Sequence, residues 1–431
     1  MQGRLNLFQA TMLRWRELHP YNAVHVVTVG SALEPSRLRT RIESRLETAR
    51  LTGLVLDRRR RRFDYRGGPA AIELTVLAGG DDPLHVAERE IERQLNLPFP
   101  RDGAFMPFRF FAVEAGGAFH LGLAYDHFIA GGDSIAILLD KVVESYRSEA
   151  SAAAPPWTPR RYPSTYARLF LRHAGFAILG LRRMPSLIAS CRRSYRAPCH
   201  ADREATIAFL SRRVAAADFA ALVRATRDWG VTLNDLFLAM LLLALAPLAR
   251  GRNQAHHRRE LAAASIMNVR GEFERDANDT FGQFLASLRV SHPVPPGIDL
   301  RDLTQEIHAE TARIKAEKLY LQTLLALGWA GFAWRFLRPD HRRCFLAKHY
   351  AIWAGVTNLN ADPLCPALRD AGPGTEYLRA VPTGPLAPIV FAITTFGGIM
   401  QIGVSFRAAD VGRELAESVA TEFLRCVRSL A

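Results

Sequence analysis

Between Ala118 and Tyr146 the pattern of apolar and polar positions changes twice. Residues 118–125 are mostly apolar and predict a strand, and residues 126–133 predict a short turn that contains glycine. From residue 134 onward the apolar side chains follow the i, i+3, i+4, i+7, i+8 spacing of a helix with one buried face: Ile135, Leu138, Leu139, Val142 and Val143. The stretch therefore predicts a strand, a tight loop and a helix in direct succession.

His127 lies in that loop, between the strand and the helix. A neutral imidazole is the side chain best able to accept a proton near neutral pH, so His127 is a candidate general base. The alternative is that it is simply one packed or capping residue among thirteen histidines. At the start of the helix, Asp133 or Ser134 is expected to be the N-cap.

The hydrophobic pattern predicts further elements on both sides of this stretch. Before it we expect strands at 22–30, 71–77 and 106–114, a hairpin at 51–66, and helices at 34–48 and 83–95. Mixed strands and helices at this spacing indicate an α/β sandwich of about 150 residues. After residue 200 we expect a strand at 206–214, a helix at 217–229 and an apolar helix from Thr232 to about Arg250. Thr232 is the expected cap of that helix, which we expect to be buried rather than to span a membrane.

A chain of 431 residues exceeds what one hydrophobic core usually carries, so two domains are expected. Alanine and proline are frequent in residues 152–163, which indicates a linker. The predicted division is a first α/β domain at 1–150, a basic, proline-containing crossover at 151–200, and a second α/β domain at 201–431.

Residues 166–196 combine apolar side chains with seven arginines. A basic amphipathic helix of this kind can lie on an anionic membrane surface. Packing on the protein's own surface is the simpler alternative, and both stay open at this point. A second uncharged stretch, residues 319–334, leaves open a peripheral contact with lipid or with a long acyl chain.

The net charge of +14 and the isoelectric point near 10.1 are compatible with anionic partners, and an effect of solubility and high-GC codon usage is the equally open alternative. The sequence contains no recognised nucleic-acid-binding module, and the basic residues are spread over many segments, so we expect no nucleic acid. Five consecutive arginines at 58–62 mark the tip of the predicted hairpin. They are expected to form a solvated turn, with a docking patch for phosphate or a carrier protein as the alternative.

The cysteines at 191, 199, 344, 365 and 426 have neither metal-ligand spacing nor the density of a disulfide scaffold. We therefore expect free thiols and no metal site. The first twenty residues contain arginines every few positions and no apolar core of signal-peptide length. A cytoplasmic protein is expected, placed on the inner membrane surface if residues 166–196 bind lipid.

The residues around His127 resemble a known motif. The run from Asp126 to Ser134, DHFIAGGDS, resembles the HHxxxDG motif of the acyltransferases that depend on CoA or a carrier protein. This superfamily includes chloramphenicol acetyltransferase, the condensation domains of nonribosomal peptide synthetases, the BAHD enzymes and the bacterial wax ester synthases. His127 aligns with the catalytic histidine and Gly132 with the glycine, whereas Asp126 replaces the first histidine and Gly131 replaces the aspartate.

Five more segments resemble regions of condensation domains and wax ester synthases, in the same order along the chain. They are residues 230–239 (GVTLNDLFLA), 265–270 (SIMNVR), 281–284 (FGQF), 356–359 (VTNL) and 394–405 (TTFGGIMQIGVS). The DFGWG motif of the BAHD branch is absent from the sequence. The resemblance therefore covers most of the chain and points away from the BAHD branch.

The resemblance implies two chloramphenicol-acetyltransferase-like α/β lobes with a cleft or tunnel between them. It implies transfer of an acyl group from a CoA or phosphopantetheine thioester to a hydroxyl or amine of a small acceptor, with no permanently bound cofactor. His127 would be the general base, and Thr394, Thr395 and Asn358 are candidate donors to the oxyanion. The donor would be acyl-CoA or an acidic acyl carrier protein, which fits the basic charge.

Asn268 and Arg270 are expected to be framework residues of the site. In the relatives, an arginine pairs with the aspartate of the motif, and here Gly131 offers no carboxylate, so Arg270 needs another partner. Asp133 is the nearest carboxylate in sequence. The departure at Gly131 supports an alternative function: a catalytically degenerate homologue that binds a carrier protein or acyl chain without turnover, at a membrane surface if residues 166–196 bind lipid.

Overall fold

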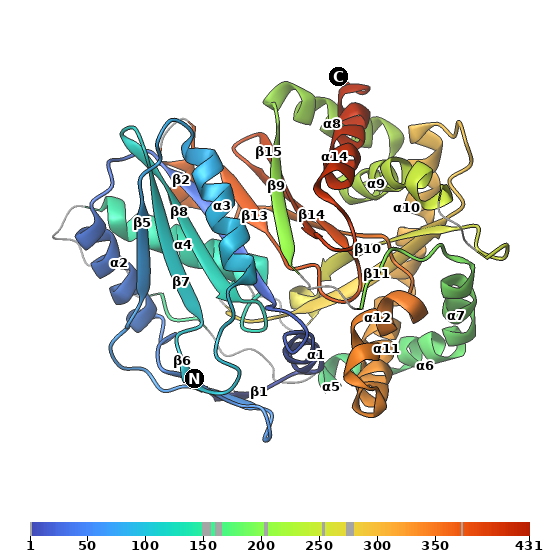
Figure 1. Ribbon diagram of the computed structural model, residues 1–431, viewed down its shortest axis with the longest axis horizontal. Coiled ribbons are helices and arrows are strands. Elements are labelled where there is room, and N and C mark those ends of the chain that lie inside the picture. Colours follow the sequence, from blue (N-terminus) through green and yellow to red (C-terminus); the bar gives the residue numbers. More distant parts are fainter. Residues whose placement is uncertain are drawn as a thin grey trace.

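The computed structural model describes residues 2–148, 157–159, 166–201, 206–251, 255–272, 280–371 and 374–431, apart from the side chains of residues 339 and 340. The strands form a five-stranded, a six-stranded and a small four-stranded sheet (Figure 1). The two larger sheets, with the helices that cover them, are the first and second lobes. The small sheet joins β1 (Gln2–Arg4), β4 (Arg62–Tyr65), β3 (Leu54–Asp57) and β6 (Gly103–Phe105).

The sheet of the first lobe has its strands in the order β13 (Tyr377–Ala380), β2 (Asn22–Val29), β8 (Ala118–Asp126), β7 (Phe108–Ala115) and β5 (Glu73–Leu77). Helix α3 (Pro83–Asn96) covers one face, while α2 (Pro35–Thr48) and α4 (Gly132–Arg147) cover the other (Figure 1). Val24 and Val26 pack in the cluster that contains α3, whereas Ala23 and Val27 belong to the cluster of α4. The apolar character of β2 on both faces thus follows from burial on both sides.

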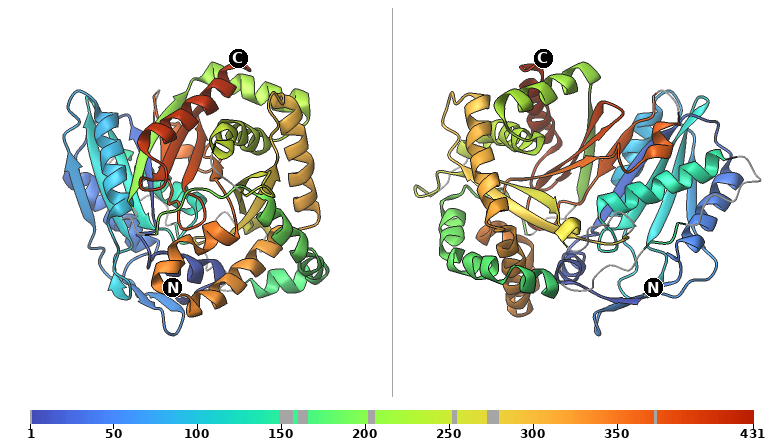
Figure 2. Two further views of the ribbon diagram at one scale, coloured as in Figure 1. Left: turned by 45° about the vertical axis from the view of Figure 1, so that its right-hand side comes forward. Right: turned by 180° about the vertical axis from the view of Figure 1, so that it is seen from behind.

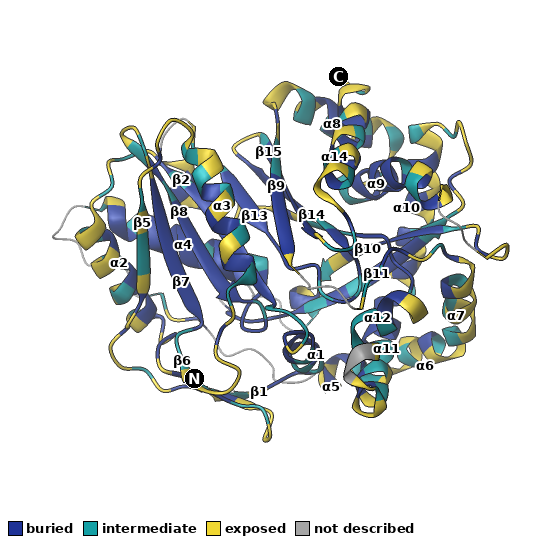
Figure 3. Ribbon diagram, in the orientation of Figure 1, coloured by how far each residue is buried: buried dark blue, intermediate teal, exposed yellow. Residues whose placement is uncertain are grey.

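The second lobe has a six-stranded sheet in the order β11 (Leu285–His292), β10 (Leu261–Asn268), β12 (Ala354–Asn360), β14 (Ile389–Phe396), β15 (Ile399–Arg407) and β9 (Ile207–Val214). One face carries α8 (Ala216–Trp229), α9 (Leu233–Arg250), α10 (Leu300–Ala316) and α14 (Arg413–Arg428) (Figures 1 and 2). Thr232 caps α9 as predicted, and its Oγ1 accepts the Asp235 N–H at 3.3 Å. Helix α9 is long and apolar enough to cross a membrane, but it is mostly buried and forms the core of this lobe (Figure 3).

A third group of helices lies at one end of the second lobe (Figure 2). It contains α1 (Leu7–Trp15), α5 (Ala167–Arg172), α6 (Ala174–Arg182), α7 (Met184–Arg193), α11 (Tyr320–Ala333), η3 (Trp334–Phe336) and α12 (Pro339–His349). Helix α11 packs against α1, α6 and β11. The basic crossover therefore includes three short helices, while the alanine- and proline-rich residues 152–156 and 160–163 lie outside the described residues.

The chain passes between the lobes more than once. Strand β13 pairs with β2 in the first sheet and also contacts β14 and β15 of the second. Helix α13 (Pro366–Arg369) packs against α4, where the Asp140 carboxylate accepts the Leu368 N–H at 2.9 Å. The predicted domain limits of 150 and 200 stay predictions, but part of the region 201–431 belongs spatially to the first sheet.

Two local expectations are wrong. Cys199 and Cys344, 145 residues apart, form a disulfide with a 2.03 Å sulfur–sulfur distance, while Cys191, Cys365 and Cys426 are free and buried. The expectation of five free thiols failed because cysteine spacing carries no information about segments that meet only in the fold.

The predicted cap of α4 is also wrong, since that helix begins at Gly132, with Gly131 as an extended N-cap that offers no side-chain hydrogen bond. Asp133 and Ser134 lie within its first turn and form contacts with the second lobe instead.

Candidate active site

A cavity of about 460 Å³, called the central cavity below, lies between the lobes. Its walls come from the loop between β8 and α4, the strands β10, β12 and β13, and the helices α1, α11 and α12. Its volume lies within the range of small-molecule binding sites. His127 is half-buried and lines it, so the candidate base lies on the wall of a cavity and not in a sealed core.

Main-chain contacts fix His127 at this wall. Its N–H donates to the Tyr21 carbonyl at 3.0 Å, and its carbonyl accepts from Gln283 Nε2 at 2.6 Å. The ring lies 5.8 Å from the Tyr21 ring and 5.7 Å from the Tyr125 ring, measured between centroids. Nδ1 is buried, while the residue as a whole lines the cavity.

Burial lowers the pKa of His127 to about 4 because the imidazolium loses its hydration. The positive charge of Arg379 lowers the pKa further, while the Ala130 carbonyl acts in the opposite direction. The imidazole is therefore neutral at physiological pH, which is the form that accepts a proton or a hydrogen bond.

The loop is held without the carboxylate of the motif. Gly131 N–H donates to the Gly282 carbonyl at 2.9 Å, and Gln283 Nε2 also reaches the Ala130 carbonyl at 3.2 Å. A Cβ at Gly131 would lie 3.3 Å from Gln283 Oε1, which is buried without a partner. The buried Gln283 amide thus occupies the space beside the glycine and anchors two carbonyls of the loop.

Asp126, at the position of the first histidine of the motif, forms a buried ion pair with Arg16. Arg16 Nη2 also donates to the Pro100 carbonyl at 2.9 Å. Because Arg16 is the C-cap residue of α1, this ion pair ties the beginning of the loop to the first helix. Asp126 therefore anchors the loop, and it does not line the cavity.

Two contacts tie the first turn of α4 to the end of β10. The Asn268 amide donates to the Asp133 carboxylate, and both side chains line the central cavity. Arg270 Nη2 donates to Ser134 Oγ at 2.7 Å, and the same hydroxyl accepts the Gly282 N–H at 3.2 Å.

These contacts supply a partner for Arg270. Its guanidinium lies 5.3 Å from the centre of the Phe284 ring. Burial lowers its pKa, and the negative charge of Asp133 counteracts the shift. A hydroxyl, an aromatic ring and a nearby carboxylate thus take the place of the motif aspartate.

Arg379 is a part of the site that the sequence analysis missed. It is buried on β13, where Nε donates to Thr394 Oγ1 at 2.8 Å and Nη2 donates to the Ile393 and Thr357 carbonyls at 2.6 and 3.1 Å. All three acceptors are uncharged, and desolvation lowers the pKa of Arg379. A Cβ at Gly132 would lie 3.1 Å from Nη1, so the glycine gives this guanidinium its place at the cavity wall.

His25 on β2 was also missed. Its Nδ1 lies 2.8 Å from the Tyr377 hydroxyl and its Nε2 lies 3.4 Å from the Tyr125 hydroxyl. Burial holds its pKa well below the usual value, so the ring is neutral. In sequence, His25 and Arg379 are both polar residues with an apolar residue on each side, which is the one signal that marks them.

The predicted site residues fall into two groups. His127, Gly132, Asp133, Asn268 and Asn358 line the central cavity. Thr394 and Thr395 are buried behind this wall, where the Thr394 hydroxyl accepts from Arg379. Asp126, Gly131, Ser134 and Arg270 also lie behind the wall. They hold the loop through the contacts described above.

The opposite end of the cavity is apolar. Its lining comes mainly from α11, α12 and the strands β12 and β14. The apolar residues of these elements and of the loop before β14 are Ala326, Leu327, Ala330, Ala333, Phe345, Leu346, Val356, Leu386 and Val390. The cavity thus joins a polar end around His127 to an apolar end under α11 and α12.

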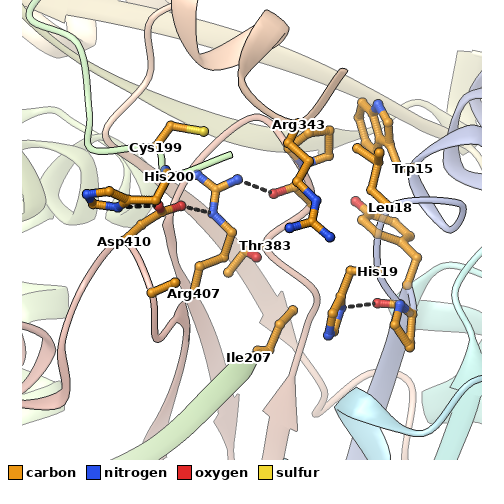
Figure 4. A pocket seen from close by; sticks show the side chains of 15 residues that line it. Trp15, Leu18, His19, Cys199, His200, Ile207, Arg343, Thr383, Arg407 and Asp410 are labelled. Carbon is orange, nitrogen blue, oxygen red and sulfur yellow. Dashed lines mark hydrogen bonds and ion pairs between the residues drawn. The ribbon is translucent and has the colours of Figure 1, made fainter. Parts of the chain in front are cut away.

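A smaller cavity of about 40 Å³ adjoins it and shares Trp15, Tyr21 and Thr383 (Figure 4). Arg407 Nε lies 2.7 Å from Asp410 Oδ2, and Arg407 Nη1 donates to the Gly384 carbonyl at 3.1 Å. The volume suffices for one or two water molecules. We regard it as a small side pocket of the central cavity, next to the disulfide at Cys199.

No protein-family model and no curated protein matches the chain. Solved structures do. The condensation domain of the polyketide synthase MokA is similar with a TM-score of 0.69 and 12% identity, over 100% of this chain and 97% of that one. The epimerization domain of tyrocidine synthetase B gives a TM-score of 0.67 and 14% identity, over 100% and 96%. The starter condensation domain of rhizomide synthetase, solved with C8-CoA, gives 0.66 and 15%, over 100% and 95%.

At these identities the likeness establishes the fold. The chain has the fold of condensation and epimerization domains, and the prediction of two chloramphenicol-acetyltransferase-like lobes is confirmed.

Proposed function

We propose that the protein is an acyltransferase of the condensation type, which moves an acyl group from a CoA or carrier-protein thioester to a hydroxyl or amine. The observation that carries this proposal is the position of His127, a neutral imidazole on the wall of a cavity between two lobes of this fold. One of the similar condensation domains was solved with an acyl-CoA.

The proposed reaction begins when Nε2 of His127 accepts a hydrogen bond from the acceptor's hydroxyl or amine. The acceptor atom attacks the thioester carbonyl carbon as its proton moves to Nε2, and the carbonyl π electrons move to oxygen. Collapse of this intermediate breaks the carbon–sulfur bond, and the departing thiolate takes the proton from the imidazolium. The products are an ester or amide and a free thiol. Binding both reactants in one cavity makes the attack effectively intramolecular.

Arg379 has two effects in this proposal. Its charge disfavours the imidazolium, so the proton moves to His127 only as the new bond forms. The same charge favours the oxyanion, and Nη1 at the cavity wall is a suitable donor. The Asn358 amide, which is exposed to the cavity, is a second candidate donor.

The apolar end of the cavity supports an aliphatic or aromatic acyl group as substrate. Most of its lining under α11 and α12 is apolar, although Thr323 and His349 also line the cavity, and this lining would remove an apolar chain from water. The low pKa of His127 and the glycine at position 131 support the alternative of a homologue that binds such a chain without turnover.

Thiol release from a panel of acyl-CoA thioesters with alcohols and amines tests the proposal. We expect the wild type to exceed the uncatalysed rate, and His127→Ala to lose roughly 10²- to 10⁴-fold. His120→Ala is the matched control, because His120 lies on β8, the strand that leads to His127, bonds Thr28 and does not line the cavity. Equal release by wild type and His127→Ala would contradict catalysis by this residue, and chain binding without release would favour the degenerate homologue.

A further inference from the structure

An apolar surface lies on the outer side of the third helical group. We call it the helical face and define it by α5, α6, α7, α11 and η3. Large apolar side chains project from it into solvent: Leu171, Phe176, Ile178, Leu181, Ile188, Trp329, Phe332 and Phe336. Leu171 is 77% exposed, Phe336 75% and Trp329 69%. Eight such residues on one group of neighbouring helices exceed the scattered apolar residues of an ordinary surface.

The charge of the same surface is mostly positive. Residues 166–196 and 319–338 contain no aspartate or glutamate. The exposed arginines of these two segments are Arg168, Arg172, Arg182, Arg192, Arg193, Arg196, Arg335 and Arg338. Three glutamates from outside the two segments form ion pairs with this surface: Glu260 with Arg193, Glu272 with His173 and Glu317 with Arg183. Large apolar side chains among an excess of arginines are the composition of a helix that lies in the interface of an anionic bilayer.

The helical face is continuous with the central cavity. A shallow surface groove is lined by Leu7, Phe170, Leu324, Leu325, Gly328, Trp329 and Phe332. Trp329 lines both this groove and the central cavity, and Leu327 and Ala330 on the same helix line the cavity. Helix α11 is therefore the wall that separates the outer apolar surface from the apolar end of the cavity.

We propose that the helical face docks on the surface of an anionic lipid bilayer, with Leu171, Trp329 and Phe336 in the interfacial layer and the arginines at the lipid headgroups. The groove favours lipid over a protein segment, because it offers no hydrogen-bonding side chain except the Trp329 indole N–H. In this position α11 brings the apolar end of the central cavity to the membrane. Docking does not depend on turnover, so it stands or falls separately from the proposed acyl transfer.

Co-sedimentation with vesicles tests the docking. The full-length wild type is mixed with vesicles of phosphatidylcholine alone and with vesicles that contain about a third phosphatidylglycerol. We expect binding to the anionic vesicles that weakens at high salt. Arg182→Gln with Arg192→Gln, and separately Leu171→Ser with Phe336→Ser, should each weaken binding by about tenfold or more.

The matched control is Arg59→Gln with Arg62→Gln, which removes the same charge from exposed positions on the hairpin of β3 and β4. This control should bind like the wild type. Equal loss in the control and in the Arg182 and Arg192 variant would reduce the effect to net charge and overturn the proposal. Failure of the wild type to bind anionic vesicles would also overturn it. If the wild type instead binds an acidic carrier protein and the same variants lose that binding, the helical face is a protein-binding surface. Thiol release with soluble substrates, measured on every variant, separates this result from the proposed acyl transfer.

Discussion

The two ends of the central cavity are built on different principles. At the polar end, single hydrogen bonds fix each group: Gln283 holds the His127 carbonyl, Tyr377 holds His25, and Thr394 holds Arg379. At the apolar end no directional bond is needed, and the side chains of α11 and α12 define only a shape. The arrangement of the polar end therefore depends on the exact positions of single atoms, whereas the shape of the apolar end depends on the volumes of its side chains.

This difference assigns different consequences to mutations at the two ends. A change at the polar end should alter the rate of reaction or the stability of the loop, since a buried donor or acceptor loses its partner. A change at the apolar end should alter which acyl chain is accepted, because packing of a chain depends on complementary volume. The predictions below test this separation.

The largest effect is expected for Arg379→Gln. Glutamine retains a donor for the Thr394 hydroxyl but removes the positive charge beside His127. If Arg379 stabilises the oxyanion, kcat should fall by roughly 10²- to 10³-fold, and the pKa of His127 should rise from about 4 toward its usual value. Steady-state thiol release and an NMR titration of the His127 ring measure the two effects. An unchanged kcat with a shifted pKa would show that Arg379 does not stabilise the oxyanion. Its only effect would then be to lower the pKa of His127.

The second prediction concerns the position where the chain departs from the motif. Gly131→Asp would bring a carboxylate against Gln283 Oε1 and the Gly282 carbonyl, 3.3 and 3.7 Å from the new Cβ. All of these are acceptors, so we expect a loss of stability of roughly 1–3 kcal/mol and no gain of activity. Urea unfolding measures the loss. Gly131→Ala is the control for the Cβ alone, because φ at this residue is −82°, which any residue adopts. A gain of stability in Gly131→Asp would show that the loop still accommodates the arrangement of the motif.

The sequence predicted the strand, the loop and the helix around His127 because each has a strong local pattern. It also marked residues 281–284 by resemblance, although not that Gln283 clamps the loop. His25 and the pairing of Cys199 with Cys344 were missed because their partners lie 352 and 145 residues away in the chain. Arg379 was missed because its partner Thr394, although only 15 residues away, is on a strand of the other sheet. The cap of α4 was missed because Asp133 and Ser134, both good capping residues, are bonded to the second lobe instead.

The third prediction addresses the apolar end. Ala330 lies on α11, half-buried, with its side chain at the cavity wall. Ala330→Phe should fill part of the apolar end and lower kcat/KM for the longest accepted acyl chain by roughly tenfold, while short chains react as before. A series of acyl-CoA thioesters of increasing length measures the effect. Ala174→Phe is the control, since Ala174 is exposed on α6 away from the cavity. A uniform loss for all chain lengths would show that this end does not hold the acyl group.

The smallest effect is the response of the polar end to acid. The pKa of folded His127, about 4, lies below the usual value of 6.5, so between these pH values the unfolded chain binds more protons than the folded one. The free energy of unfolding should therefore fall as the pH decreases from 6.5 toward 4, by at most about 1.4 kcal/mol per pH unit for this residue. Burial lowers the pKa of His25 as well, which adds to the effect, whereas Asp140, with its pKa raised to about 6, acts in the opposite direction.

These three groups titrate over overlapping pH ranges. The informative quantity is therefore the pH-dependent change in the free energy of unfolding, compared between the wild type and His127→Asn, which removes one titrating ring. Urea unfolding at pH 7.0 and 5.5 should show a smaller loss of stability in the variant than in the wild type. An equal loss in both proteins would mean that His127 keeps an ordinary pKa in the folded state. The ring would then be better hydrated than its buried Nδ1 implies, and the polar end would be more open to water.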